Sequence, residues 1–159
     1  MNTVFTLHPH PTTPCAAVRS LTAELCNTTL HYRLDADVSR LKLDSDDDVL
    51  WRHTCFECFL GGAGTHYVEY NFAPDGRQRA YAFRAERVPD ENAAVPAPLP
   101  TVWSPNAPPL ELQVTLPAVP KFLGLCAVIE TADGRLHYFA LQHSDNQPDF
   151  HRRDTRVRI

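Results

Sequence analysis

A chain of 159 residues with 43% hydrophobic and 21% charged residues has the composition of a single globular domain, large enough to bury roughly two-thirds of its unfolded surface. Its net charge is −4 and no block of lysines and arginines occurs, so we expect no nucleic-acid partner and no anionic-membrane partner. No apolar run approaches about 20 residues and no signal-peptide pattern precedes the first strand-like run, so neither a membrane span nor export is expected. Five cysteines without an export signal indicate free thiols in a reducing, cytoplasmic compartment.

The first third of the chain predicts an edge strand and a hairpin. Residues 1–16 are punctuated by prolines, which predicts an irregular lead-in with an edge strand at residues 4–7. Alternating runs at residues 18–26 and 29–34 predict a hairpin that turns at Asn27-Thr28. Leu41 and Leu43 favour a short strand. The acidic run at residues 44–48 lacks the spaced ligands and the glycine of a calcium loop, so we interpret it as a solvated loop.

Residues 54–60 predict the central strand, because they are dense in β-formers and aromatic side chains. Side chains of a strand alternate between two faces of a sheet. We therefore expect one face to belong to the core and the other face to carry Glu57, with Trp51 at its edge. The core face holds Thr54, Phe56, Cys58 and Leu60, and the opposite face holds His53, Cys55, Glu57 and Phe59.

The remaining runs complete an all-β pattern. Residues 66–72, 79–84, 110–116, 122–130 and 135–142 alternate, and residues 156–159 favour a last edge strand. Residues 86–109 are rich in proline and predict a long irregular loop within the same domain. No helical periodicity extends over ten residues. The sequence therefore predicts a single domain over residues 1–159, folded as an antiparallel β-sandwich of the jelly-roll or immunoglobulin-like kind.

Trp51 and Glu57 are the leading candidates for a ligand site. An indole face stacks on the C–H face of a pyranose ring, and a carboxylate accepts hydrogen bonds from neighbouring hydroxyl groups. The alternative is that Trp51 covers an end of the sandwich while Glu57 pairs with an arginine of a neighbouring strand. Both interpretations stay open at the level of the sequence.

Glu69 and Asn71 share one face of the strand predicted at residues 66–72. If this strand lies beside that of Glu57, two carboxylates and an amide line one surface. Such a surface suits a polyol, a metal ion or, if one carboxylate is desolvated, acid–base chemistry. The alternative is a cross-strand ion-pair network whose cation is Arg52, Arg79 or Arg84.

Cysteines and histidines offer a second kind of site. Cys55 and Cys58 point to opposite faces of a strand, so they cannot share a metal or a disulfide, and we interpret them as structural thiols. His53 and Cys55 share a face, which leaves a zinc site completed by His143 or His151 as an alternative. The polar segment at residues 148–154 predicts either a loop that lines a site or a set of turn caps and surface ion pairs.

Two sets of motifs resemble a known family. The first set is Leu50-Trp51, Cys55-Phe56-Glu57, Phe59-Leu60, Tyr67, Glu69, Asn71-Phe72, Pro74 and Gly76. The second set lies at residues 127–130, 133–136, 138–141 and 148–151. Together they are similar to the motifs of DOMON-like domains related to family-9 carbohydrate-binding modules, in particular the small stand-alone bacterial members. The resemblance extends over residues 18–154.

This resemblance implies a jelly-roll-like sandwich whose relatives bind sugars or haem. In the sugar-binding relatives a Trp and a Glu form part of the ligand slot, and these match Trp51 and Glu57. The resemblance further implies a second aromatic ring at Phe150 and an arginine at Arg79 or Arg84. The haem-binding relatives use Met and His ligands. This chain has a single methionine, at its first position, so haem is poorly supported as a cofactor.

The sequence therefore predicts a non-catalytic domain that binds a small, carbohydrate-like ligand and needs no cofactor. Three alternatives remain: a haem- or metal-binding module, an enzyme that uses Glu57, Glu69 and a histidine for acid–base chemistry, and a module that docks a protein partner through its edge strands or its Pro-rich loop. The candidate ligand-binding residues are Trp51, Glu57, Glu69, Asn71, Arg79, Arg84, His143, Phe150 and His151.

Overall fold

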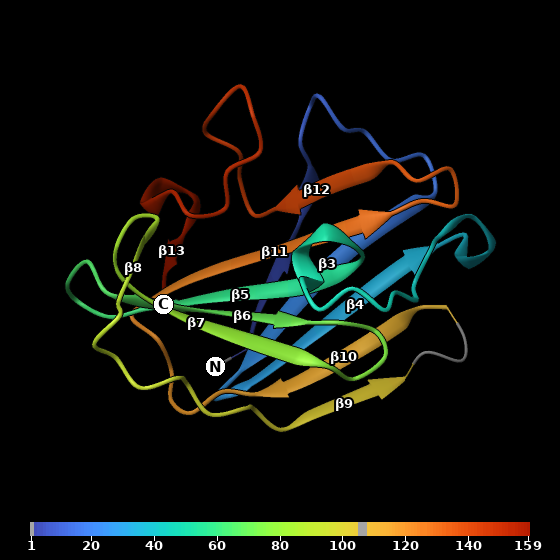
Figure 1. Ribbon diagram of the computed structural model, residues 1–159. Coiled ribbons are helices and arrows are strands. Elements are labelled where there is room, and N and C mark those ends of the chain that lie inside the picture. Colours follow the sequence, from blue (N-terminus) through green and yellow to red (C-terminus); the bar gives the residue numbers. More distant parts are fainter. Residues whose placement is uncertain (1, 105–107) are drawn as a thin grey trace.

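The computed structural model describes residues 2–104 and 108–159 and shows two antiparallel β-sheets packed face to face (Figure 1). The first sheet has the strand order β1 (Asn2–Thr6), β3 (Val18–Cys26), β4 (Thr29–Ala36), β10 (Leu110–Thr115) and β9 (Thr101–Ser104). The second has the order β2 (His8–Pro9), β12 (Leu136–Ala140), β11 (Phe122–Glu130), β5 (Cys55–Gly61), β6 (Tyr67–Phe72), β7 (Gln78–Ala85) and β8 (Val88–Pro89), and β13 (Val157–Arg158) also pairs with β11. The predicted all-β sandwich is confirmed.

Helical structure in the described residues is limited to three short 3-10 turns, η1 (Val38–Arg40), η2 (Leu50–Arg52) and η3 (Arg153–Thr155). Within residues 2–104 and 108–159, no helix is long and apolar enough to cross a membrane.

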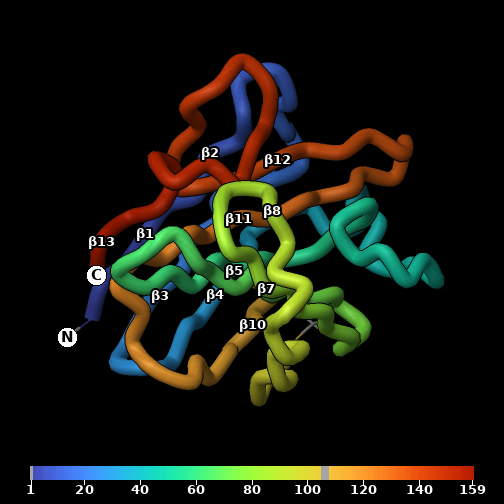
Figure 2. The backbone as a smooth tube through the Cα atoms, turned by 60° about the vertical axis from the view of Figure 1, so that its left-hand side comes forward, coloured from blue at the N-terminus to red at the C-terminus, as the bar shows by residue number. Residues whose placement is uncertain are grey.

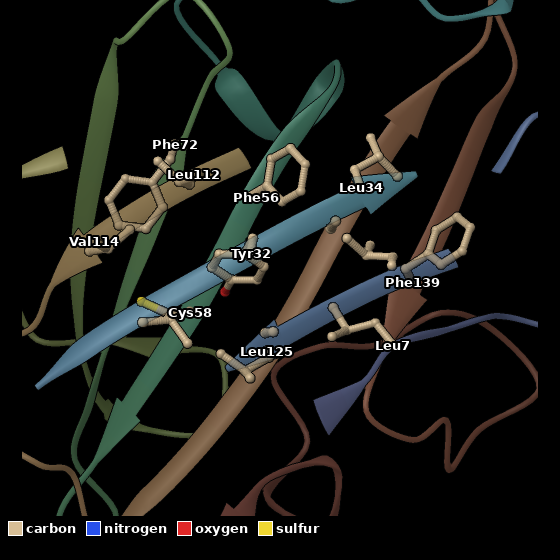
Figure 3. Close-up of a cluster of buried hydrophobic side chains, with 14 of the residues drawn as sticks. Leu7, Tyr32, Leu34, Phe56, Cys58, Phe72, Leu112, Val114, Leu125 and Phe139 are labelled. Atoms are coloured by element: carbon tan, nitrogen blue, oxygen red, sulfur yellow. The ribbon is translucent and has the colours of Figure 1, made fainter. Parts of the chain in front are cut away.

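The core lies between the two sheets, where alternate side chains of each strand meet (Figure 3). Phe56 and Cys58 of β5 face inward, as predicted, and both are almost completely buried. Tyr32 of β4 crosses from the opposite sheet, and its hydroxyl donates a hydrogen bond of 2.6 Å to the backbone carbonyl of Glu57. Its ring meets that of Phe56 edge-on, with 5.4 Å between centroids. These contacts hold the middle of β5 in register over the first sheet.

Three hairpin turns form where the sequence places residues that tolerate a left-handed backbone, and the first of them is the turn predicted at Asn27-Thr28. Asn27, between β3 and β4, has a φ of 54°. Gly76, between β6 and β7, has a φ of 91°, and Gly134, between β11 and β12, has a φ of 82°. Glycine has no Cβ to clash in this region, so these sequences close their hairpins without strain.

The predicted irregular lead-in at residues 1–16 is partly wrong, because its described part contributes to both sheets. β1 is the edge of the first sheet, as predicted at residues 4–7, and β2 pairs with β12 of the second. The intervening Leu7 is buried in the core, which anchors the crossing between the sheets.

The predicted Pro-rich loop at residues 86–109 is also more ordered than expected. It contains β8 and the edge strand β9, which pairs with β10, while residues 105–107 lie outside the described part of the chain. Gln78 holds the loop by bonding the backbone of Leu99 in both directions, at 2.8 and 2.9 Å. The short strand predicted at Leu41 and Leu43 is wrong, since Leu41 makes only an isolated bridge to Thr131.

The chain after β12 folds back over the outer face of the second sheet, beside the β7–β8 turn (Figure 2). A second apolar cluster forms there from Phe59, Tyr67, Cys126 and Ala140, and Phe150 packs against this cluster. The Arg156 guanidinium lies 3.8 Å from the centroid of the Tyr67 ring, a cation–π contact. Gly124 makes room for it, because a Cβ at this position would lie 3.2 Å from the Arg156 side chain. This segment forms one wall of the candidate site.

Candidate functional site

A pocket of about 410 Å³ opens on the outer face of the second sheet, opposite the core. Strands β5, β6, β7, β11 and β12 contribute its floor and sides, η2 and the β7–β8 turn part of its rim, and the C-terminal segment a wall. The lining residues are Trp51, Glu57, Glu69, Tyr81, Phe83, Arg87, Val128, Tyr138, Pro148, Asp149, Phe150 and His151.

Two buried carboxyl groups lie on the floor of the pocket. Strands β5 and β6 are neighbours, with Glu57 directly across from Asn71 and Glu69 across from Phe59. The strand of Glu69 and Asn71 therefore lies beside the strand of Glu57, which the sequence alone could not establish. Glu57 is 2% exposed and Glu69 is 5% exposed. Neither makes a salt bridge with an arginine in the described residues, so the alternative of an arginine-paired network is not what the structure contains.

The Glu57 carboxyl resists ionisation. Burial, followed by the charge of Glu69, raises its pKa well above the ordinary value of 4.5. Its hydrogen-bond partner in the described residues is the Cys55 thiol, which donates to Oε1 at 3.2 Å. Burial and the adjacent Glu57 also raise the pKa of this thiol, which keeps Cys55 protonated. The environment of Glu57 therefore favours the protonated form of its carboxyl group.

Glu69 is the carboxyl group that titrates near neutral pH. Burial raises its pKa to about 7. His151 Nε2 lies 3.5 Å from Glu69 Oε2. Burial and then the nearby Arg87 lower the pKa of His151 to about 4, so this imidazole is neutral at pH 7 and the contact is not an ion pair.

A short hydrogen-bond chain orients His151. The backbone N–H of Arg87 donates to the Tyr67 hydroxyl at 3.1 Å, and this hydroxyl lies 2.8 Å from His151 Nδ1. The Tyr67 hydroxyl can donate this bond to Nδ1, and in that tautomer the single imidazole proton lies on Nε2, on the side of Glu69.

Aromatic rings supply most of the pocket walls. Trp51 and Tyr81 are 48% and 37% exposed, so each has a face open to solvent. Phe83 stacks on Tyr67 with 4.8 Å between ring centroids, and Tyr138 meets Phe150 edge-on at 6.0 Å. A site with an acidic floor and aromatic walls can bind a ligand that combines apolar faces with hydrogen-bonding or positively charged groups.

An ion pair closes one side of the rim. Arg87 lies 2.7 Å from Asp149, and Asp149 also accepts the backbone N–H of His151 at 3.0 Å. Arg87 adopts a φ of 58°, which is unusual for a residue other than glycine, asparagine or aspartate. This conformation lets the turn between β7 and β8 bring its arginine toward the C-terminal segment, and it is the kind of local strain that accompanies functional sites.

The structure brings together five of the nine candidate residues. Glu57 and Glu69 line the floor, and Trp51, Phe150 and His151 line the surrounding walls. Trp51 reaches the pocket from η2 rather than from the strand itself, because β5 begins at Cys55.

Three candidates lie elsewhere. Arg79 is 3.4 Å from Asp48 of the acidic loop, and Arg84 is exposed on the opposite face of β7 from Tyr81. His143 contacts the backbone carbonyl of His8 at 2.8 Å. Neither Arg79 nor Arg84, the two positions expected for an arginine of the site, lines the pocket, whereas Arg87 does.

Asn71 is completely buried on the same face as the two glutamates but does not line the pocket. Within the described residues neither atom of its amide has a hydrogen-bond partner of good geometry. The amide still lies close enough to the Glu69 carboxyl to oppose the rise in its pKa. An unsatisfied buried amide costs free energy unless water or a ligand reaches it, so Asn71 extends the polar floor inward.

In the structure, the residues of the alternative zinc site do not lie together. His53 Nδ1 is 2.7 Å from Glu130, outside the pocket, while Cys55 faces Glu57. In the described part of the chain, no group of three or more His, Cys, Asp or Glu residues is arranged to hold a metal ion. Cys58 lies in the core, on the opposite face from Cys55, as the alternation predicts.

Sequence reasoning missed several residues that line the pocket. Tyr81 and Phe83 share a face of β7 with Arg79, so the alternation of the strand contained a signal for them. Tyr138 and Val128 follow in the same way from the pairing of β11 with β12. Arg87 had no local signal, because its position depends on a turn and on a residue 62 positions later, Asp149.

Comparisons with known proteins add no relative: no family model, no curated protein and no solved structure matches this chain.

Proposed function

We propose that the outer-face pocket binds a small polyhydroxylated, carbohydrate-like ligand without transforming it. The observation that carries the proposal is the placement of a half-exposed indole, Trp51, on the same pocket as two buried carboxyl groups, Glu57 and Glu69. The C–H face of a pyranose suits the indole, and its hydroxyl groups suit the carboxyl oxygens. The volume of about 410 Å³ falls within the range of small-molecule sites.

The motif resemblance to DOMON-like domains supports the same ligand class, since Trp51 and Glu57 occupy the matching positions. Membership of that group is part of this proposal. A cytoplasmic address is a further part, supported by five cysteines that all remain free thiols.

Trp51→Ala is expected to weaken sugar binding about tenfold, because an aromatic contact contributes roughly 0.5–1.5 kcal/mol beyond area burial. Isothermal titration calorimetry with a panel of mono- and disaccharides measures this change. Val102→Ala is the control, since Val102 is exposed on β9 of the other sheet. If Trp51→Ala and Glu57→Gln both bind like the unchanged protein, the pocket is not the sugar site. Haem and divalent metals belong in the same panel, and a response to them alone would favour the cofactor-binding alternative.

An acid–base enzyme is the second candidate, and Glu69 favours it. A carboxyl group with a pKa of about 7, beside the neutral imidazole of His151, is poised to exchange protons near neutral pH.

This second candidate predicts accelerated mutarotation of a reducing sugar, a reaction that needs only a general acid and a general base. Polarimetry is expected to give a rate that rises with pH through about 7, as Glu69 ionises, and that disappears in Glu69→Gln. A rate equal to that of buffer for every sugar that binds would leave the non-catalytic proposal standing alone.

A further inference from the structure

The floor of the pocket carries acidic groups without a matching cation. Of the nearby cationic side chains, Arg87 is held by Asp149 at 2.7 Å, and Arg156 lies over the Tyr67 ring while donating to the backbone carbonyl of His151. In the described residues no lysine or arginine makes a salt bridge with Glu57 or Glu69.

The carboxyl of Glu57 is buried, lines the pocket and has only a weak thiol donor as its partner in the described residues. Asn71, directly across from it, is likewise buried without a hydrogen-bond partner in the described part of the chain. Buried polar groups of a folded protein are normally satisfied, so the incompletely satisfied carboxyl of Glu57, which lines the pocket, indicates a position that a ligand group completes.

Aromatic faces surround this acidic floor. Trp51, Tyr81, Phe83, Tyr138 and Phe150 all line the pocket. The face of an aromatic ring attracts a cation, and the attraction strengthens when water is excluded. Neutral hydroxyl groups can hydrogen-bond to these carboxyl groups, but only a cation also favours their ionised form, which burial opposes.

The geometry points to a ligand that carries a protonated amino group, as an amino sugar does, with its ammonium over Glu57 and Glu69 and its ring against the aromatic wall. This inference rests on the proposed function and narrows its ligand class.

A proton balance follows from this arrangement. Without ligand, burial disfavours the charged form of both glutamates. With a pKa of about 7, a part of the Glu69 population holds its proton at pH 7, and the raised pKa of Glu57 acts in the same direction. An ammonium at the floor favours the carboxylate form, so a carboxyl O–H bond breaks and its proton passes to the buffer, while the ammonium keeps its own protons. Binding of the cationic ligand is therefore expected to release a proton.

Calorimetry at pH 6.5 with matched sugars tests the inference. Glucosamine, galactosamine and 6-amino-6-deoxyglucose are compared with their neutral parents and with the N-acetyl derivatives of the first two, which keep the nitrogen but lose its charge. At least one amino sugar is expected to bind tenfold or more tightly than its neutral parent and, for glucosamine and galactosamine, than its acetylated form. Titration in two buffers with different ionisation enthalpies is expected to give a net release of protons to the buffer.

Glu57→Gln and Glu69→Gln are expected to reduce the preference for the amino sugar to less than threefold, whereas Trp51→Ala should weaken the amino sugar and its parent by similar factors. Circular dichroism melting verifies that each variant is folded. If a glutamine variant fails to fold, the inference is tested by whether the unchanged protein releases protons when it binds the amino sugar.

The outcomes separate the two proposals. Equal binding of parent and amino sugar, without proton release, would overturn this inference and leave the sugar-binding proposal intact. Cyclohexylamine, which has the charge but no hydroxyl groups, is the complementary probe. If it binds as tightly as the amino sugar, the inference of a cationic ligand is supported and the proposal of a polyhydroxylated ligand is overturned. Binding of none of these probes would overturn both.

Discussion

Replacing Glu69 by glutamine is expected to stabilise the protein above pH 7, by up to about 3 kcal/mol, and to leave its stability at pH 4 nearly unchanged. Burial raises the pKa of Glu69 from its ordinary value of 4.5 to about 7, and each pKa unit corresponds to about 1.4 kcal/mol of stability. Glu69 is 5% exposed, so solvent screens little of this free energy.

The sign follows from proton binding. Between pH 4.5 and about 7 the folded chain holds the Glu69 proton more often than the unfolded chain does. The free energy of unfolding therefore falls as the pH rises through this window, and the full loss is reached above the folded pKa. Glutamine does not ionise, so the variant keeps the free energy of unfolding that the unchanged protein loses when Glu69 ionises. Glu57 adds a fall of the same sign. Glu69→Gln removes only the part of it that arises from the charge of Glu69, and the double variant Glu57→Gln/Glu69→Gln removes the part that arises from burial as well.

Urea denaturation between pH 4 and pH 9 measures the difference between the variant and the unchanged protein. Glu91→Gln is the matched control, because Glu91 is exposed in the loop after β8. A Glu69→Gln curve that runs parallel to that of the unchanged protein at every pH would mean that Glu69 ionises as a solvated carboxyl group. The acidic floor, and with it the ligand class proposed above, would then lose its physical basis.

Replacing Phe56 by alanine is expected to cost about 3–5 kcal/mol of stability, the range found for deleting a large buried aromatic side chain. Phe56 is 1% exposed, and its ring meets those of Tyr32 and Trp103 edge-on, each with 5.4 Å between centroids. Its loss removes apolar burial, leaves a cavity between the sheets and breaks both aromatic contacts. Because a domain of this size is stabilised by roughly 5–15 kcal/mol in total, the variant approaches the limit of folding.

Phe122→Ala is the control for Phe56→Ala, since Phe122 is only partly buried at the start of β11. Equilibrium denaturation at pH 5 is expected to show less than half the loss for the control. A cost below about 1 kcal/mol for Phe56→Ala would contradict the packing of this face of β5 against the first sheet.

The local features of the fold could be predicted because they depend on residues close in sequence. Alternation in residues 54–60 assigned Phe56 and Cys58 to the core and Glu57 to the outer face, and the structure agrees. The hairpin at Asn27 follows from a residue that tolerates a positive φ. The sequence missed β2 and β9 for one reason: a short edge strand gains its hydrogen bonds from a partner strand, and its own sequence carries almost no signal.

The candidate site likewise has features that the sequence predicts and features that depend on the tertiary structure. The sequence by itself determined which residue types face outward from β5 and β6, because side-chain alternation is a property of a single strand. Only the tertiary structure decided that Arg87 rather than Arg79 or Arg84 reaches the rim, since this requires a left-handed turn and the distant Asp149.

The tertiary structure also decided the chemistry of the floor. Glu69 is an ordinary carboxyl group in the sequence, and its raised pKa arises from burial. Part of its cover comes from the C-terminal segment, where His151 contacts its carboxyl group more than 80 residues away along the chain. Burial depends on all the elements that surround a side chain. The sequence therefore determined that carboxyl groups are present, and only the folded protein determined their raised pKa values.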